Sequence, residues 1–143
     1  GAGGVLLIVR MLSEAEITAL IECALQLRLF VLLETFDEAD IARATLLVDK
    51  YRAAGQLLVG LNCRDLDTLK VVPGRLEQLL RVLPDSVPRV AESGITTAAD
   101  AGRIAIAGYE VVLVGSALMA ALEPLQLVQA MLSTGRKERA QRS

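Results

Sequence analysis

Leu57-Leu58-Val59-Gly60-Leu61 is a short apolar run that ends abruptly in the polar cluster Asn62-Cys63-Arg64-Asp65. Four other runs have the same form, a largely apolar, strand-sized segment followed at once by polar or glycine residues. They cover 5–9, 30–33, 87–91 and 111–114, and they end at Arg10, Glu34, Glu92-Ser93-Gly94 and Gly115-Ser116. Short apolar runs without polar alternation are typical of strands buried on both faces of a parallel sheet.

Segments with helical periodicity separate the five runs. The first begins at Ser13, where Glu16 completes a capping-box pattern before an apolar stripe. The others are expected at about 37–55, 74–83, 97–108 and 124–133. Strand and helix therefore alternate five times, which predicts an α/β fold with a parallel sheet and right-handed crossovers in one domain, 1–134. The charged segment 135–143 is expected to form a solvated or frayed tail.

Composition limits the function classes. Hydrophobic residues make up 53% and aromatic residues 3% of the 143 residues, so Leu, Val, Ile and Ala are expected to build the core. The net charge is −2 and no basic patch is interleaved with aromatic residues, which argues against nucleic-acid binding. Histidine is absent, which excludes a histidine base and a Ser-His-Asp triad, and no metal site is predicted. No apolar run approaches the ~20 residues of a membrane-spanning helix, so no membrane partner is expected.

Two further features bear on the context of the chain. Cys23 and Cys63 are expected to be free thiols in a reducing cytoplasm, with Cys23 filling space in a helix. The beginning, Gly1-Ala2-Gly3-Gly4, reads as the interior of a longer sequence.

Polar side chains at the ends of parallel strands are the candidates for chemistry, because ligands bind there in open α/β sheets and β/α barrels. Glu34 is a candidate general acid or base, or else a surface glutamate. Asn62 and Arg64 are candidates for binding a substrate hydroxyl and an anion, while the alternative for this cluster is an Asx-type turn with a surface Arg64–Asp65 pair.

Two glycine-serine clusters follow the last two strands. Ser93-Gly94 and Gly115-Ser116 can expose backbone N–H groups to an anion, with Gly115-Ser116 at the beginning of a helix. Each dipeptide alone is compatible with an ordinary turn. Together they predict a phosphate site, because the loops after the last two strands of β/α barrels commonly form one.

Five motifs resemble the indole-3-glycerol phosphate synthase family, in its order and near its spacing. They are 5–13, 32–34, 60–66, 90–95 and 114–119, and the resemblance runs from about Gly1 to Met131. It implies a TIM (β/α)8 barrel, of which this chain carries five parallel β/α units, the fourth to the eighth. It also implies conversion of 1-(2-carboxyphenylamino)-1-deoxyribulose 5-phosphate to indole-3-glycerol phosphate, with loss of carbon dioxide and water. This cytoplasmic step of tryptophan biosynthesis uses no metal or organic cofactor.

The resemblance assigns roles to the candidate residues. Glu34 resembles a catalytic carboxylate proposed as a general base, Asn62 an asparagine beside the substrate, and Glu92 a glutamate that lines the pocket. The substrate-binding set comprises Leu6 and Leu7 in the apolar wall around the aromatic ring, Arg64 as a polar contact, and Ser93, Gly94, Gly115 and Ser116 around the phosphate.

The same resemblance implies that part of the family's machinery has no counterpart here. The family's catalytic lysine lies in a Lys-Asp-Phe motif on the third strand, and neither Lys50, in a predicted helix, nor Lys70, in a predicted loop, matches it. Five strands of a barrel leave two open edges, so we expect a complementary N-terminal half-chain or self-association. Repacking into an open flavodoxin-like sheet is the competing fold.

Two other function classes stay open. One is a non-catalytic phosphate-binding remnant of the synthase. The other is a different phosphate-binding barrel, such as a phosphoribosylanthranilate isomerase, which the motif 60–66 together with Glu34 disfavours.

Overall fold

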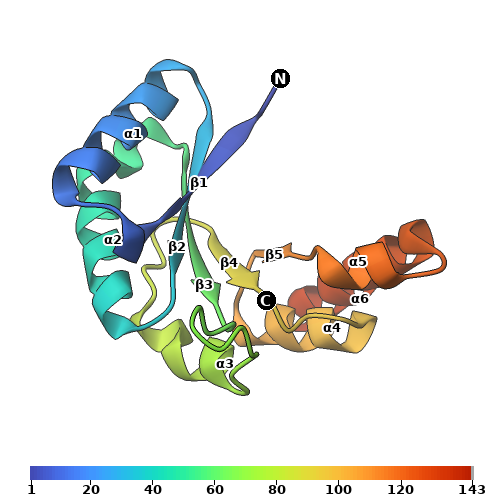
Figure 1. Cartoon of the computed structure of the whole chain (residues 1–143). Helices are drawn as coiled ribbons and strands as arrows, with labels where there is room; N and C mark the ends of the chain where they lie inside the picture. The colour runs from blue at the N-terminus through green and yellow to red at the C-terminus, as the bar shows by residue number, and fades with distance from the viewer. Residues whose placement is uncertain (143) are drawn as a thin grey trace.

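The five expected strands form one parallel sheet in the computed structural model, which describes residues 1–142. The strands are β1 (Gly4–Ile8), β2 (Phe30–Thr35), β3 (Leu57–Asn62), β4 (Arg89–Glu92) and β5 (Val111–Leu113). Their spatial order is the chain order, and every neighbouring pair is parallel (Figure 1). A flavodoxin-like sheet would reverse its strand order at a switch point. The expected partial barrel is therefore confirmed, and the competing fold is not.

Helices follow the strands as the pattern predicts. They are α1 (Glu14–Gln26), α2 (Glu38–Tyr51), α3 (Arg75–Leu79), α4 (Ala98–Ala107), α5 (Ser116–Ala120) and α6 (Pro124–Arg142), with 3₁₀ turns at Val9–Met11, Arg52–Ala54 and Leu80–Val82. Ser13 and Thr97 make capping boxes with Glu16 and Asp100, and the Asp37 carboxylate accepts the N–H of Asp40. These polar caps satisfy donors that a helix end leaves free, which is why the helices begin there.

The last helix is longer than the sequence predicts. We expected it to end near Ser133 with a charged tail, but α6 continues to Arg142. The reason is packing against α4, beside which α6 lies (Figure 1). The position of a Cβ on Gly135 would be 3.8 Å from the carbonyl oxygen of Ala101, and one on Gly102 would be 2.9 Å from Cγ2 of Thr134. Small residues thus let the two helices approach closely, and this contact supports the charged segment in helical form.

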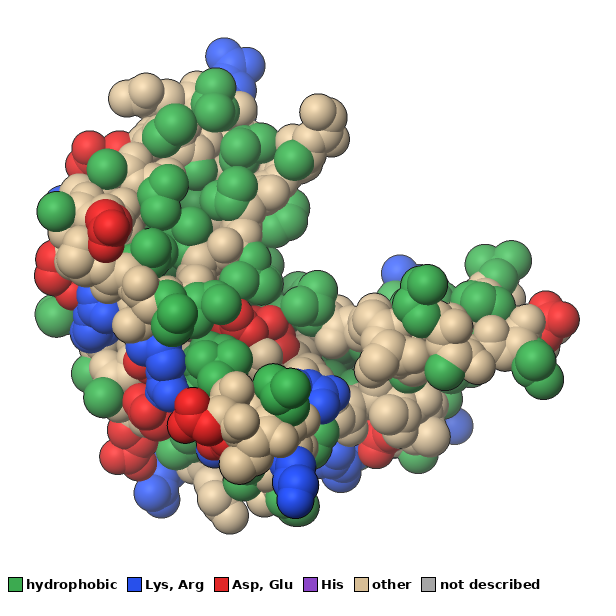
Figure 2. Space-filling model, viewed as in Figure 1, with side chains coloured by type: hydrophobic (Ala, Val, Ile, Leu, Met, Phe, Trp, Pro, Cys, Tyr) green, Lys and Arg blue, Asp and Glu red, His purple; other side chains and the backbone are tan. Residues whose placement is uncertain are grey.

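One face of the sheet packs against the helices, and the other face lines a hollow. Side chains of alternate residues, such as Val31, Leu33, Val59 and Leu61, are buried against the helices in the main core. The intervening residues face the hollow visible in Figure 2, which hydrophobic side chains line. Leu6 on this face is 41% exposed, and Val111 and Leu113 on the edge strand are exposed as well. The polar ends of the strands open into this hollow.

Candidate functional site

A pocket of about 580 Å³ lies at the carboxyl ends of the strands. It is lined by Leu6, Glu34, Asn62, Arg64, Val71, Glu92, Ser93, Gly94, Ile95, Thr96, Leu113, Val114, Gly115 and Ser116. All of the site residues predicted from sequence are in this set except Leu7. The parallel register brings the strand ends together, since Asn62 lies opposite Glu92 and Glu92 opposite Leu113.

Leu7 is the residue that the structure places elsewhere. Its side chain is buried in the core among the helices, whereas the neighbouring Leu6 lines the pocket. Successive side chains of a strand point to opposite faces, so two adjacent leucines cannot both form the wall of one pocket. The prediction for Leu7 is therefore wrong, and the strand alternation alone could have corrected it.

Glu34 is held in place by Asn62. The Nδ2 amide of Asn62 donates a hydrogen bond of 2.6 Å to Oε1 of Glu34, across the β2–β3 pair. The other end of the same amide, Oδ1, accepts the backbone N–H of Arg64 at 2.9 Å. Both ends of Asn62 are thus used, which fixes the direction of its donor group. Glu34 itself is 6% exposed, so the position of its carboxylate is well defined.

Glu92 is unusual in the pocket because its carboxyl group is buried without a hydrogen-bond partner among the described atoms. It is 1% exposed, and neither carboxyl oxygen has a hydrogen-bond partner among the atoms that the structure describes. Burial raises the pKa of Glu92 from 4.5 to about 8, and the negative charge of the adjacent Glu34 adds to the shift. A pKa raised this far favours the protonated form of Glu92 at neutral pH, and the Glu34 carboxyl lies beside it. Two carboxyls in this arrangement can serve as proton donor and acceptor.

The chain turns sharply after β4. Ser93 and Gly94 both have left-handed backbones, with φ of 66° and 69°. A Cβ on Gly94 would lie 3.0 Å from Sγ of Cys63 and 3.2 Å from Cγ1 of Val71, so a larger residue would not fit without movement. A left-handed backbone is costly for serine, and such strain concentrates at functional sites. At this turn, Ser93 and Gly94 bring backbone atoms to the pocket wall.

The beginning of α5 also lines the pocket. Gly115 precedes this short helix, and a Cβ on it would meet nothing within 4 Å. Ser93-Gly94 and Gly115-Ser116 therefore line one pocket from two successive strands. Backbone N–H groups in such turns and helix ends favour anions.

The cluster after β3 forms the Asx-type turn of the alternative interpretation, whereas the binding roles of Asn62 and Arg64 stay predictions. The Asp65 carboxylate accepts the N–H groups of Asp67 and Thr68, as an Asx-type turn would, and Nη1 of Arg64 donates to the carbonyl oxygen of Leu69 at 2.7 Å. Arg64 nevertheless lines the pocket. The same folded loop returns Val71 to the pocket through a bridge to Arg64. Val71 has no signal in the local sequence, because only the fold of the loop brings it there.

Thr96 and the apolar wall residues Ile95, Leu113 and Val114 were also missed. Leu113 could have been found, because it follows Val111 by two residues in β5 and lies opposite Glu92. Arg10, the polar end of the first run, does not line the pocket. Its Nε donates to Asp40 at 2.8 Å and its guanidinium also pairs with Asp37, so it joins the 3₁₀ turn after β1 to the beginning of α2.

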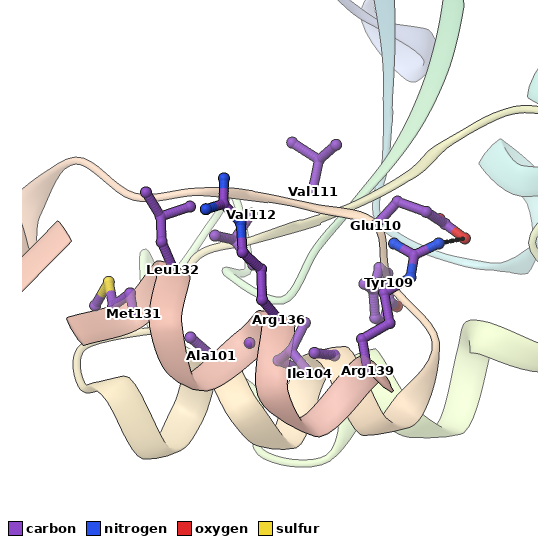
Figure 3. A pocket seen from close by; sticks show the side chains of 12 residues that line it. Ala101, Ile104, Tyr109, Glu110, Val111, Val112, Met131, Leu132, Arg136 and Arg139 are labelled. Carbon is purple, nitrogen blue, oxygen red and sulfur yellow. Dashed lines mark ion pairs between the residues drawn. The ribbon is translucent and has the colours of Figure 1, made fainter. Parts of the chain in front are cut away.

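A second cavity of about 440 Å³ lies between β5, α4 and α6 (Figure 3). Its walls are mostly apolar and include Ala101, Ile104 and Met131. Arg136 and Arg139 of α6 also line it, and Arg139 pairs with Glu110 at 3.8 Å. This cavity lies on the helix side of the sheet and contains no buried acid–base pair. The pocket at the strand ends is the better candidate.

Within residues 1–142, no three His, Cys, Asp or Glu side chains come together in a way that could hold a metal ion. In the same range, no helix is long and apolar enough to cross a membrane.

The sheet and its pocket define an α/β protein of the barrel type, with a candidate ligand site at the carboxyl ends of the strands. A sequence model of the indole-3-glycerol phosphate synthase family matches residues 1–131. The chain belongs to the indole-3-glycerol phosphate synthase family.

Individual relatives carry the same family name. The chain is 41% identical over 128 residues to an indole-3-glycerol phosphate synthase of Opitutus terrae, covering 90% of this chain and 46% of the relative. It is 40% identical to that of Micrococcus luteus, covering 83% and 42%. The synthase of Lacticaseibacillus paracasei is 32% identical, covering 98% and 49%. The chain thus spans a little under half the length of these relatives.

Solved structures support the fold alone. A thiamine phosphate pyrophosphorylase from Pyrococcus furiosus has a TM-score of 0.67 at 17% identity, covering 96% of this chain and 61% of that one. A chain of a BexX/CysO complex from Amycolatopsis orientalis has a TM-score of 0.56 at 22% identity, covering 85% and 49%.

Proposed function

We propose that this chain supplies the carboxyl-terminal part of an indole-3-glycerol phosphate synthase active site, acting in tryptophan biosynthesis. The observation that carries the proposal is the buried Glu92, whose pKa is raised to about 8, beside Glu34 at the strand ends of a member of this family. The reaction would convert 1-(2-carboxyphenylamino)-1-deoxyribulose 5-phosphate to indole-3-glycerol phosphate, with release of carbon dioxide and water.

The acid–base roles follow from the chemistry of this conversion. Closing the ring forms a carbon–carbon bond to the ribulose carbonyl carbon, and the carbonyl oxygen must then take up a proton. Loss of carbon dioxide and of that oxygen as water restores the aromatic ring, which needs both a proton donor and a proton acceptor. Glu92 has a proton to donate at neutral pH, and Glu34, oriented by Asn62, can accept one.

Different parts of the pocket would bind the phosphate and the aromatic ring of the substrate. Ser93, Gly94, Gly115 and Ser116 would hold the phosphate with backbone N–H and hydroxyl groups, and the Arg64 side chain adds positive charge. Leu6 would contact the aromatic ring from the apolar side. Phosphate is thus proposed to bind at the end of the pocket opposite β1.

A partner is part of the proposal, since the chain spans less than half of its relatives. A complementary chain would add strands at the open edges of β1 and β5 and would supply the lysine that the family resemblance implies. Self-association through the same edges is the alternative. We further propose a cytoplasmic location, where the free Cys23 and Cys63 would remain reduced.

A complementation assay tests this function. The first three β/α units of the Opitutus terrae synthase would be expressed separately and mixed with this chain. We expect negligible turnover by this chain alone, turnover in the mixture, and a loss of about 100-fold or more with Glu92→Gln. Asp85→Asn, at an exposed position in the loop before β4, should leave turnover unchanged.

The non-catalytic remnant remains the second candidate, because the phosphate-binding clusters lie entirely within this chain. Formation of a stable complex without turnover, together with binding of phosphate, would favour the remnant and contradict the synthase.

A further inference from the structure

Gly60 lies at the floor of the pocket, in the middle of β3. It pairs with Glu34 of β2 on one side and Val90 of β4 on the other. Its carbonyl oxygen accepts a hydrogen bond of 2.7 Å from Oγ1 of Thr35, so the backbone here is held firmly. Glycine inside a strand weakens the strand and often marks a close approach by another group.

The group that approaches is the side chain of Glu92. A Cβ placed on Gly60 would overlap with Oε1 of Glu92, and it would lie 3.0 Å from Cδ of the same carboxyl and 3.1 Å from Cδ1 of Leu32. Since Glu92 is opposite Asn62 in the register, its side chain reaches back along the sheet by two residues to lie over Gly60. No residue with a side chain could occupy position 60 while Glu92 kept this place.

We propose that Gly60 is a positioning residue, whose missing side chain provides the space in which the Glu92 carboxyl lies buried beside Glu34. The role of this space in catalysis rests on the proposed function. The existence of the space follows from the geometry alone. The strand floor and the neighbouring side chains bury Glu92, while the pocket above it is open. A methyl group at position 60 would push the carboxyl off the floor, and the pocket is the side with room.

Titration of Glu92 tests this placement without any substrate. The whole chain would be labelled with ¹³C at the glutamate carboxyls, and the Glu92 signal would be assigned by its absence in Glu92→Gln. The wild-type midpoint should lie near pH 8. In Gly60→Ala we expect it to fall by about one pH unit or more, because the carboxyl gains contact with water. An unchanged or higher midpoint would overturn the proposal.

Gly102→Ala is the matched control. Its Cβ would also meet a neighbour closely, Cγ2 of Thr134 at 2.9 Å, but at the α4–α6 contact rather than in the pocket. The Glu92 midpoint should stay at its wild-type value in this variant. A shift as large as that of Gly60→Ala would mean that any added methyl group loosens the fold, and would count against a specific role for Gly60.

A second measurement applies even if Gly60→Ala fails to fold. Urea unfolding would be compared for the wild type, Gly60→Ala, Glu92→Ala and the double variant. If the space exists for Glu92, the large drop in unfolding midpoint caused by Gly60→Ala should mostly disappear once Glu92 is alanine. An equal drop in both backgrounds, or a double variant that is also unfolded, would overturn the proposal. Because neither measurement involves turnover, absence of synthase activity would leave this result intact.

Discussion

At the scale of single residues, the pocket depends on one buried carboxyl that is kept neutral. Glu92 has no hydrogen-bond partner among the described atoms, and it lies against a second acid. An isolated buried charge is strongly disfavoured, so the group retains its proton well above the ordinary range. The buried position of Glu92 is for this reason costly to the fold at alkaline pH.

Stability should therefore depend on pH through Glu92. The folded chain holds this proton to about pH 8, whereas an unfolded glutamate releases it near pH 4.5. Glu92 binds more protons in the folded state between these values, so its contribution to the free energy of unfolding should be greatest below pH 4.5 and fall as the pH rises to 8. Glu92→Gln should remove up to about 5 kcal/mol of this loss between pH 4 and pH 9, measured by urea unfolding.

Asp85→Asn serves as the control for that comparison, because Asp85 is an exposed carboxylate outside the helices and strands. It should retain the wild-type decline. A decline of the same size in Glu92→Gln would show that another group is responsible.

Ser116 offers a test of the anion end of the pocket. Replacing it with glutamate places a negative charge where we propose that phosphate binds. Inorganic phosphate, titrated calorimetrically, should bind about 10-fold or more weakly to Ser116→Glu than to the wild type. Ser86→Glu adds the same charge before β4, at the opposite end of the strand, and should change binding little. Equal binding by both variants would argue against the assigned site.

Most of the pocket could be predicted from sequence because its residues directly follow recognisable strands. Glu34, Asn62 and Glu92 end apolar runs, and parallel pairing brings those ends together. Val71 could not be predicted, since a loop folded through Arg64, Asp65 and Leu69 returns it to the pocket. The lack of a hydrogen-bond partner for Glu92 could not be predicted either, because it depends on distances between strands that a local sequence pattern does not indicate.

At the scale of elements, polar caps determine where the helices begin. Thr97 and Asp100 form a reciprocal capping box at α4, with the Thr97 hydroxyl accepting the Asp100 N–H at 3.1 Å and the Asp100 carboxylate accepting the Thr97 N–H at 3.0 Å. Because α4 also supports α6, this cap affects both helices. Caps were predictable from sequence, whereas the length of α6 depended on contacts with α4 that its own charged sequence does not indicate.

Thr97→Ala should lower the free energy of unfolding by about 1 kcal/mol, because it leaves helix N–H groups without their acceptor. Urea unfolding by circular dichroism would measure the change. Ser86→Ala, at an exposed loop position, provides the comparison and should have an effect close to zero. If the two variants were equally stable, the cap would not contribute to the stability of the fold.

At the scale of the whole molecule, the curved sheet is open on two sides. β1 and β5 each have one free edge, and apolar side chains on the hollow face are exposed, including Phe30 at 48% and Val111 at 41%. Free strand edges beside apolar surface favour pairing with another chain. The free strand edges and the exposed apolar side chains therefore favour association with another chain.

Isolated protein should accordingly run as a dimer or larger species in size-exclusion chromatography at tens of micromolar. The double variant Phe30→Lys and Val111→Lys should shift it toward the monomer, because two charges on the hollow face oppose burial. Leu46→Lys changes a leucine that is 72% exposed on α2 and should not alter the elution volume. A monomeric wild type at every concentration would contradict this expectation.

The identity of spatial and chain order in the sheet has a consequence for how such a protein forms. Each β/α unit packs mainly on the units just before and just after it in the chain. Short sequence separations between contacting residues favour rapid folding, and an array of this kind can nucleate at any unit and grow in both directions. A protein assembled in this way can gain a unit at either end without rearranging those already in place.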